Sequence, residues 1–391
     1  MKWFCCQLGA REHYAVPRAL LRGGMLGEFF TDLWIPPGTL LHSWKNGRSG
    51  RFHPELANAR ITAPNIAALT FELKASLARE NGWKLIRERN EWFQRQALAQ
   101  LARTKGNGQQ TVFAYSYAAR EIFEFARARG WRTVLGQIDP GPADERIISV
   151  LHNKCGAEWK PAPVEYWNDW RDECSLADQI VVNSAWSRDA LLSEGIPAEK
   201  IRVIPVAYEP LQETKSFQRE YPYRFSSERP LRVLFLGHIS LRKGVRQLLD
   251  AVKLLEGEHV EFWFVGPTHI VITPDWREHP QCKWFGVVPR VAVDKFYRDA
   301  DVFVFPTHSD GFGLTQLEAQ SWKLPVIASR HCGEVVRDGV NGVLLEEVSA
   351  QRMAEALLQF LDKPESLSAM SRESGVPAKF SLENLAADLR A

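Results

Sequence analysis

The sequence predicts an α/β fold with two doubly wound domains that face a central cleft. The chain has 391 residues, more than one hydrophobic core usually organises. Short apolar runs alternate with segments of helical period in both halves, and the polar stretch 209–230, which has no such period, separates them. Because single helices join successive strands, both sheets should be parallel, with ligands bound at the carboxyl ends of the strands.

The second half shows this alternation most clearly. The run from Val233 to Leu236 ends at Gly237 and is typical of a parallel strand that is covered on both faces. Apolar residues then recur at helical spacing from Val245 to Leu255. The remaining strands are predicted at 260–265, near 284–285, at 302–305 and at 325–328, and the remaining helices around 293–298, after 313 and over 350–361.

The first half repeats the pattern less cleanly. Strands are predicted at 111–117, 133–138, 179–182 and 201–205, with helices at 120–129 and 186–194. The chain is therefore expected to divide into four parts. These are an N-terminal Rossmann-like domain over 1–208, a linker over 209–230, a C-terminal Rossmann-like domain over 231–375, and a last helix at 376–391 that packs back toward the N-terminal domain.

The composition argues against several classes of protein. Hydrophobic residues make up 45% of the chain and charged residues 25%, as in soluble globular proteins. A net charge of +2 gives no general attraction to nucleic acid. The six cysteines show no CxxC pair and no metal-ligand spacing, which favours free thiols in a reducing compartment. Because the sequence shows no secretory signal and no apolar run as long as a membrane span, we expect a cytoplasmic protein.

The turn from Ser309 to Gly313 leaves a predicted strand and opens a short helix. Gly311 and Gly313 allow the backbone to approach a ligand closely, and the first N–H groups of the helix favour an anion or a polarised hydroxyl. Glu318 lies on the mainly apolar stripe of that helix, where a carboxylate needs strong donors such as the hydroxyls of a ribose. Asp310 could accept from sugar hydroxyls. Alternatively, the glycines only make a tight turn and Glu318 reaches solvent.

A second loop, from Gly237 to Gly244, also leaves a predicted buried strand and enters a helix. It carries Arg242 and Lys243 side by side. Arginine can contact two phosphate oxygens at once, whereas lysine acts as a point charge. Cations fixed in advance stabilise the charge that a diphosphate leaving group develops as a sugar departs. Each cation alone could be a solvated loop charge, but together with the loop of Asp310 they favour a site for a nucleotide-diphosphate sugar.

At these residues the sequence resembles the family-four retaining glycosyltransferases, of the glycosyl transferases group 1, which have the GT-B fold. Their signature is an acidic residue, seven others and a glutamate, which the segment from Asp310 to Glu318 matches with aspartate in the first place. Lys243-Gly244 matches the Lys-Gly of the family's phosphate loop, but His238 stands where that loop commonly has an arginine. Further matches lie at 177–184, 195–197, 200–205, 325–328 and 338–342.

The resemblance implies a role for each of these residues. Glu318 would bind the nucleotide ribose, Asp310 the transferred sugar, and Lys243 with Arg242 the diphosphate. Other members of the donor-binding set would be Gly237, His238, Gly311, Phe312, Gly313 and Leu314. Relatives hold the leaving group with cations and helix dipoles, so neither a metal nor a cofactor is implied beside the donor, for example a UDP- or GDP-sugar. Retention is attributed in the family to a front-face reaction in which the departing phosphate helps to take the acceptor's proton.

The N-terminal half is expected to bind the acceptor. Many relatives place a histidine after a strand of this domain, but here the strand ends at Asp139, which either fills that place or is only a turn residue before proline. The first turn of the chain leaves a short apolar strand through Gly9. Arg11 and His13 in this turn are candidate acceptor contacts, although a loop arginine and a half-buried histidine need no ligand.

The stretch 74–105 is predicted to be helical and basic, with eight Lys or Arg, three Glu and interleaved aromatic and aliphatic residues. A basic amphipathic helix can rest on an anionic membrane, where lipid-linked acceptors are found. The protein would then be cytoplasmic and peripheral at the inner membrane face. Alternatively, the stretch is a solvated outer helix of the first domain, and we favour this interpretation.

Taken together, these patterns predict a retaining, metal-independent glycosyltransferase that moves a sugar from a nucleotide-diphosphate sugar to a sugar, glycan or lipid-linked acceptor. Two alternatives stay open. A sugar-nucleotide epimerase or a phosphorylase can have the same fold. A non-catalytic protein could keep only the nucleotide-sugar pocket, and the departures at His238 and Asp310, with the missing acceptor-side histidine, would suit it.

Overall fold

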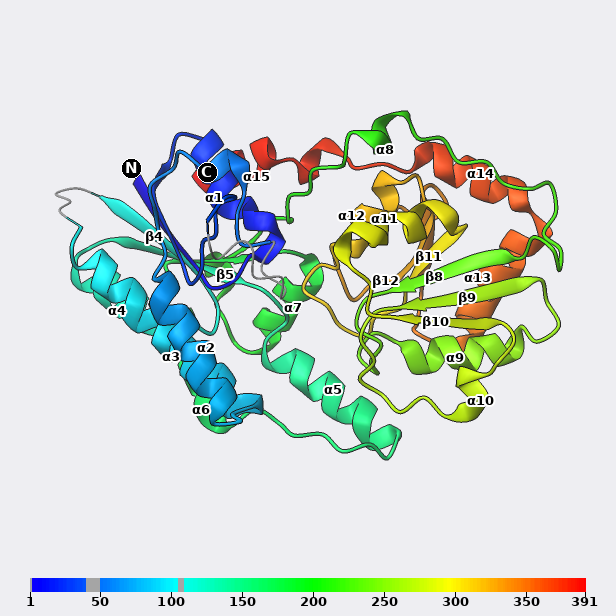
Figure 1. Ribbon diagram of the computed structural model, residues 1–391, viewed down its shortest axis with the longest axis horizontal. Helices are drawn as coiled ribbons and strands as arrows, with labels where there is room; N and C mark the ends of the chain where they lie inside the picture. The colour runs from blue at the N-terminus through cyan, green and yellow to red at the C-terminus, as the bar shows by residue number, and fades with distance from the viewer. Residues whose placement is uncertain (1, 40–49, 105–108) are drawn as a thin grey trace.

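The computed structural model describes residues 2–39, 50–104 and 109–391, and these residues form two parallel β-sheets, one of seven strands and one of six, each covered by helices (Figure 1). We refer to the seven-stranded sheet and its helices as the N-terminal domain and to the six-stranded sheet and its helices as the C-terminal domain. Within the described residues, no helix has the length and apolar character needed to cross a membrane.

The sheet of the N-terminal domain has the strand order β3-β2-β1-β4-β5-β6-β7. Its strands are β1 (Lys2–Gln7), β2 (Leu26–Thr31), β3 (Ile61–Thr62), β4 (Gln110–Tyr115), β5 (Arg132–Gln137), β6 (Gln179–Val182) and β7 (Ile201–Val203). Its helices are η1 (Arg11–Tyr14), α1 (Ala15–Arg22), η2 (Pro54–Leu56), α2 (Asn65–Leu77), α3 (Gly82–Leu101), α4 (Arg120–Ala128), α5 (Pro142–Lys154), α6 (Val164–Leu176), α7 (Ala185–Ser193) and η3 (Ala198–Lys200).

The sheet of the C-terminal domain has the order β10-β9-β8-β11-β12-β13. Its strands are β8 (Leu231–Leu236), β9 (Val260–Val265), β10 (Cys282–Gly286), β11 (Val302–Phe305), β12 (Val326–Ser329) and β13 (Gly342–Leu345). The helices that follow β7 in the chain are α8 (Glu213–Ser216), α9 (Val245–Leu254), α10 (Pro274–Arg277), α11 (Arg290–Asp299), α12 (Thr315–Ser321), α13 (Ala350–Asp362), α14 (Pro364–Glu373), η4 (Ala378–Phe380) and α15 (Leu382–Arg390).

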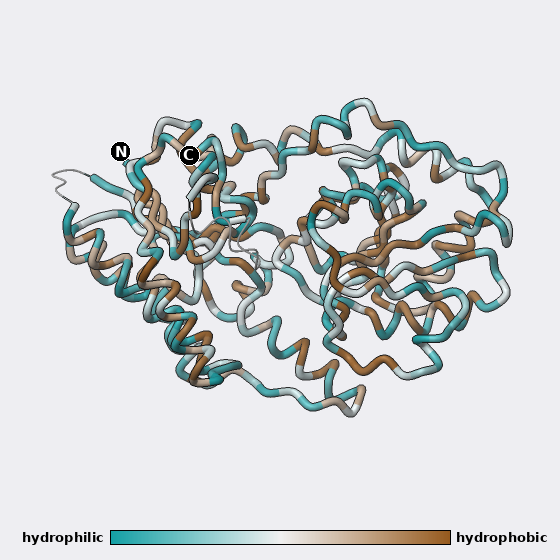
Figure 2. The backbone as a smooth tube through the Cα atoms, viewed as in Figure 1, coloured by the Kyte–Doolittle hydropathy of each residue, from teal (hydrophilic) through white to brown (hydrophobic). Residues whose placement is uncertain are grey.

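The hydrophobic cores lie on both faces of each sheet, as a parallel sheet requires. The strands are the most continuously hydrophobic part of the trace, and the outer helices alternate between hydrophobic and hydrophilic residues (Figure 2). In the C-terminal domain one face of the sheet packs with α9 and α13, and the other packs with residues of α11 and α12. This two-sided burial explains why β11 and the stretch 233–236 of β8 could be recognised as unbroken apolar runs.

The chain crosses between the domains twice. Residues 206–230 lead from β7 to β8, and after α14 the chain returns along the top of the molecule to α15, which packs against α1 of the N-terminal domain (Figure 1). The two crossings touch, because the backbone N–H of Tyr208 donates to the carbonyl of Phe380 at 2.9 Å. Arg219 ties the first crossing to the C-terminal domain through hydrogen bonds to the carbonyls of Tyr297 and Trp322.

The expectation of one helical element over 74–105 is wrong. The chain breaks between α2 and α3, where Arg79 and Gly82 adopt left-handed φ angles of 54° and 61°. Four side chains of α3 face the core of the N-terminal domain and are buried: Phe93, Gln94, Ala97 and Leu101. The two helices therefore form an outer pair on this domain, as the favoured alternative had it, and they give no support to a membrane contact. Lys105 lies outside the described residues.

Candidate functional site

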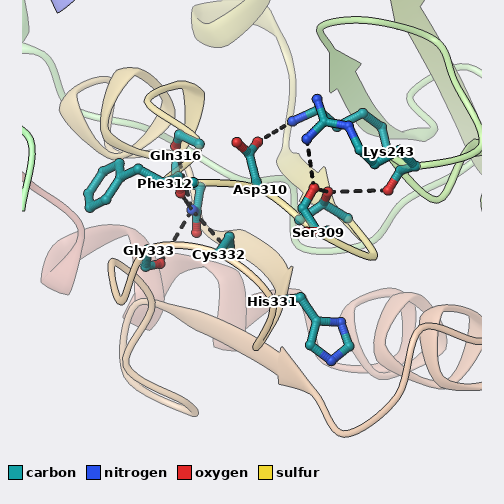
Figure 3. Close-up of polar contacts among 12 residues, drawn as sticks. Lys243, Ser309, Asp310, Phe312, Gln316, His331, Cys332 and Gly333 are labelled. Atoms are coloured by element: carbon teal, nitrogen blue, oxygen red, sulfur yellow. Dashed lines mark hydrogen bonds and ion pairs between the residues drawn. The ribbon is translucent and has the colours of Figure 1, made fainter. Parts of the chain in front are cut away.

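The loops after β8 and β11 meet at the carboxyl edge of the C-terminal sheet. Lys243 forms an ion pair with Asp310 there, and its ammonium lies 4.9 Å from the centre of the Phe305 ring (Figure 3). Burial opposes ionisation of Asp310, but Lys243 and Arg242 outweigh it and hold the pKa of this carboxyl below its usual value. Burial also lowers the pKa of Lys243, and Asp310 opposes that shift. The structure thus brings the two predicted residues into one buried charge pair.

Arg242 connects this pair to the N-terminal domain. Its guanidinium donates to the carbonyl of Ser309 at 2.9 Å and lies 3.8 Å from Asp144 of α5. Burial raises the pKa of Asp144 to about 6, although Arg242 opposes the shift. One buried oxygen of Asp144 has no hydrogen-bond partner within the described residues, so this carboxyl depends on Arg242 for its charge balance. The cationic loop therefore lies at the seam between the two domains.

The turn 309–313 is pressed against the N-terminal domain. A Cβ atom on Gly311 would lie 2.1 Å from the carbonyl oxygen of Ile138, so only glycine allows this approach. The carbonyl of Gly311 accepts from Ser184 at 2.8 Å, and Trp186 donates to the hydroxyl of Ser309 at 3.2 Å. In this arrangement the backbone at Gly311 closely approaches the other domain, whereas the sequence had suggested a close approach to a ligand.

The side chains of Phe312 and Leu314 pack in a hydrophobic cluster. Figure 3 shows Asp310 turned toward the cationic side chains and Phe312 turned away from them. Phe312 is buried against Phe380, with ring centroids 5.7 Å apart, and Leu314 packs on the same cluster. Gly313 lies between them and accepts from the backbone N–H of Gln316. Only backbone atoms of this segment remain as candidates for ligand contacts.

Glu318 is 7% exposed and has two strong donors within the protein. Arg290, at the start of α11, lies 3.0 Å from one carboxylate oxygen, and the hydroxyl of Tyr297 donates to the other at 2.8 Å. The sequence reasoning missed both partners, because they precede Glu318 by 28 and 21 residues. The order of elements was the available signal, since α11 and α12 flank β11 and pack on the same face of the sheet.

A cavity of about 410 Å³ opens between the domains beside Glu318. The first crossing and the N-terminal domain contribute Tyr208, Glu209 and the residues of the first turn to its lining, whereas α11 and α12 contribute Arg290, Asp294 and Glu318. Among the described lining residues, neither Lys243 nor Asp310 appears. The predicted donor residues thus fall into two neighbouring groups, the charge pair at the seam and Glu318 in the cavity wall.

The first turn of the chain is strained where it lines this cavity. Glu12, His13 and Tyr14 have φ angles of 50°, 52° and 60°, in a region that non-glycine residues rarely adopt. Burial raises the pKa of Glu12 to about 6, and its carboxylate lies 3.5 Å from the hydroxyl of Tyr115. Burial and the nearby Arg290 lower the pKa of His13. Strain of this kind persists only where the surrounding structure enforces it, and it is common at functional sites.

Gly9 and Arg11 occupy the other end of this turn. The backbone N–H of Gly9 donates to Asp32 at 2.9 Å, and Arg51 donates to the same carboxylate oxygen. The guanidinium of Arg11 lies 5.7 Å from the centre of the Tyr115 ring. Gly9 is therefore engaged in structure, whereas Arg11 lines a second cavity, of about 150 Å³.

Asp139 also lines this second cavity, at the carboxyl end of β5. One of its oxygens, Oδ1, accepts from the Tyr117 hydroxyl at 2.5 Å, from Gln137 at 3.1 Å and from the backbone N–H of Gly141 at 2.9 Å. Tyr117 itself has a φ of 75°. The bond to Gly141 is the turn contact that the structural alternative predicted. The same contacts orient the carboxylate through its Oδ1 atom.

The loops also carry a feature that sequence reasoning did not identify. His238 lies beside His269, from the loop after β9, with their nitrogens 2.8 Å apart. Among the described residues, no group of three or more His, Cys, Asp or Glu side chains is arranged to hold a metal ion.

Comparison with known proteins finds a family match for part of the chain. Residues 230–363 match the glycosyl transferases group 1, which confirms the resemblance expected from the sequence for this part of the chain. The D-inositol 3-phosphate glycosyltransferase of Acidothermus cellulolyticus is 31% identical over 216 residues, which cover 49% of this chain and 47% of that protein. An uncharacterised 41.2 kDa protein in the cps region of Klebsiella pneumoniae is 25% identical over 185 residues, 46% of this chain and 51% of that protein. The chain thus matches about half the length of these relatives.

Solved structures confirm the GT-B fold over the whole chain. HepE from Anabaena, in complex with UDP and glucose, has a TM-score of 0.63 at 14% identity, covering 100% of this chain and 98% of that one. The sucrose-phosphate synthase of Thermosynechococcus elongatus has a TM-score of 0.63 at 16% identity with the same coverage. At this level of identity the similarity establishes the arrangement of the two domains and no more.

Proposed function

We propose that this chain, whose residues 230–363 match the glycosyl transferases group 1, transfers a sugar from a nucleotide-diphosphate sugar to a hydroxyl group of an acceptor. This proposal is supported above all by one observation: Arg242, Lys243 and Asp310 lie together after β8 and β11, next to a cavity that Glu318 lines. This arrangement suits a substrate with two phosphates, a ribose and a sugar in a row.

Each group has a chemical task in this proposal. Lys243 and Arg242 stabilise the negative charge that grows on the diphosphate as the sugar leaves, and they do so from fixed positions. Asp310 accepts from hydroxyls of the transferred sugar while its charge is balanced by Lys243. Glu318 binds the ribose hydroxyls, which replace or share the donors that Arg290 and Tyr297 supply in their absence.

We further propose that the reaction retains the anomeric configuration and needs no metal ion. The bond from the anomeric carbon to the diphosphate oxygen breaks, the acceptor oxygen bonds to the same face of that carbon, and its proton passes to the departing phosphate. The lysine and the arginine take the electrostatic role that a divalent cation has in other transferases. Asp139 holds the acceptor hydroxyl toward the donor, because its Oδ1 is fixed by three donors.

The acceptor is a sugar, a glycan or a lipid-linked sugar. The relatives reported above include a D-inositol 3-phosphate glycosyltransferase, and the solved structures include a complex with UDP and glucose, which supports a UDP-sugar donor. A single experiment tests the function and its class. The purified protein is incubated with UDP-, GDP- and ADP-sugars, with and without a panel of simple glycosides, in buffer containing EDTA.

Transfer in the presence of EDTA, with a product whose anomeric signal in NMR matches that of the donor, is the expected result. Conversion of the donor sugar without any acceptor would instead identify an epimerase. Binding of a donor without hydrolysis or transfer in any combination would favour the non-catalytic alternative, and an inverted product would refute retention.

A further inference from the structure

His238 and His269 form a built pair at the edge of the C-terminal sheet. Their rings are nearly parallel, with centroids 4.8 Å apart and planes inclined by 17°, and Nδ1 of His238 lies 2.8 Å from Nε2 of His269. Both side chains are exposed. At this distance one nitrogen donates a hydrogen to the other. The contact is therefore a hydrogen bond between two imidazoles that remain open to a ligand.

The backbone around the pair is tied so that the two rings have little freedom to separate. Ile239 is fully buried, and its N–H donates to the carbonyl of Pro267 at 2.9 Å. The N–H of His269 returns a bond to the carbonyl of Ile239, also at 2.9 Å. On the other side of His238, a Cβ on Gly266 would lie 2.0 Å from the carbonyl oxygen of Gly237. The two loops thus continue the pairing of β8 with β9 and hold the histidines together.

The charges that face the pair come from the same loop. The groups that act on His238 are Lys243 and Arg242 on its own loop and His269 on the neighbouring loop, and Asp310 from the β11 loop is paired with Lys243. Partial loss of water around its ring, His269 and these two cations together lower the pKa of His238. These contributions favour the neutral form of His238, whereas a bound anion would favour its protonated form.

The proton count of the pair follows from its geometry. In the neutral pair one ring donates its hydrogen to the other, so the pair presents one N–H and one bare nitrogen to its surroundings. One added proton converts the bare nitrogen into a second N–H, and the pair then carries one positive charge and two outward donors. A second added proton would place two hydrogens in the 2.8 Å gap, so the bonded pair has room for only one.

We propose that the His238–His269 pair contacts the diphosphate of the donor and does so only in its singly protonated, doubly donating form, so that donor binding takes up one proton. This inference rests on the proposed function, because it assumes that a diphosphate binds beside Arg242 and Lys243. A fixed cation would bind the anion at any pH, whereas the pair makes affinity for the donor fall as the pH rises.

The test measures proton uptake during binding. UDP-glucose, and GDP-mannose and ADP-glucose where it does not bind, are titrated into the whole chain by calorimetry at about pH 7.5, in two buffers of different ionisation enthalpy. A nucleotide sugar is the right probe, because its diphosphate is esterified at both ends, whereas the terminal phosphate of free UDP titrates in this range. We expect an uptake that approaches one proton per chain, with a dissociation constant that rises by up to about tenfold per pH unit.

Substitutions assign this proton to the pair. His238→Arg supplies a permanent cation and should remove both the proton uptake and the dependence on pH, while the donor still binds. His269→Phe keeps an aromatic ring but no nitrogen, and it should weaken binding of the donor in the wild-type background. His259→Gln alters an exposed histidine at the opposite end of β9 and serves as the control with unchanged uptake.

The outcomes separate the two levels of the proposal. Binding without proton uptake, or an unchanged pH dependence in His238→Arg, overturns the role of the pair and leaves the proposed function standing. Failure of every nucleotide sugar to bind overturns both, because the pair then has no diphosphate to contact. Thermal unfolding of each variant confirms that it is folded. The wild-type titration tests proton uptake without any substitution.

Discussion

The carboxyl edges of the two sheets present chemistry in different ways. At the edge of the C-terminal sheet, Lys243 and Asp310 balance one another inside a tight charge pair supplied by two short loops. At the edge of the N-terminal sheet, Asp139 is held by neutral donors, one of them a tyrosine in an unusual backbone conformation. The first edge is suited to a charged substrate of fixed shape, and the second to a neutral hydroxyl. We interpret the difference to mean that the C-terminal edge binds the donor and the N-terminal edge binds the acceptor.

The largest effect on transfer is expected from removing the charge pair. Lys243→Met should lower the rate of transfer by about 10³-fold, because one preorganised cation at a developing charge supplies roughly that factor. It should also destabilise the fold by about 3 kcal/mol, since the largely buried Asp310 loses its lysine partner. The double variant Lys243→Met with Asp310→Asn restores the thermal unfolding temperature but not transfer. Wild-type turnover in the double variant would show that the pair is only structural.

The second test separates the two edges. Gly311→Ala places a methyl group where the carbonyl oxygen of Ile138 lies, so the domains cannot close fully. A misplacement of about 1 Å costs on the order of 10² in rate, and we expect that loss in kcat. Binding of a nucleotide sugar to the C-terminal domain should change little, as calorimetry would show. An equal loss of affinity would mean that the closed seam is itself part of the donor site.

The third test concerns the wall of the larger cavity. Glu318→Gln removes the charge but keeps a hydrogen-bonding group of the same size. Because hydrogen bonds to charged groups contribute about 1.5–3 kcal/mol, the dissociation constant of the donor should rise by about one to two orders of magnitude. UDP and a nucleotide sugar should be affected alike, since both carry the ribose. Arg290→Ala is the matched control, and it should leave or improve donor affinity because Glu318 loses a competing partner.

The smallest effect is expected at the N-terminal edge. Asp139→Asn keeps an oxygen for Tyr117, Gln137 and Gly141 but loses the charge that orients an acceptor hydroxyl. Transfer should fall by about tenfold, the low end for general-base and positioning roles, with donor affinity unchanged. A variant with full activity would show that Asp139 is the turn residue that its bond to Gly141 suggests, and the division between the edges would then need another acceptor group.

The sequence predicts the C-terminal domain better than the N-terminal one for a physical reason. Strands such as β11, buried on both faces, read as unbroken apolar runs, and the loops between them carry short-range motifs. By contrast, α5 and α6 in the N-terminal domain were not predicted, because their apolar faces are narrow. α5 also runs along the domain seam, where Asp144 meets Arg242. The break between α2 and α3 depends on the left-handed backbone of Arg79 and Gly82, and only the glycine is a residue type that favours this conformation.

The candidate site shows the same limit. Lys243 and Asp310 could be placed together from the sequence, because both loops leave the same edge of one sheet. The partners of Glu318 could not, since Arg290 and Tyr297 belong to the preceding helix and meet it only through tertiary packing. His269 was missed in the same way, because its contact with His238 depends on backbone pairing beyond the ends of β8 and β9.

The bond between Tyr208 and Phe380 has a mechanical consequence. Two polypeptide segments cross from one lobe to the other at the same place and are fastened to each other there. A single connecting segment would let the two domains twist and slide relative to each other. Two segments that are bonded to each other restrict these motions and favour rotation of the domains about one axis. The domains would then open and close along the same path each time substrate enters and product leaves. Tyr208→Pro removes the N–H of this hydrogen bond and would weaken the restriction.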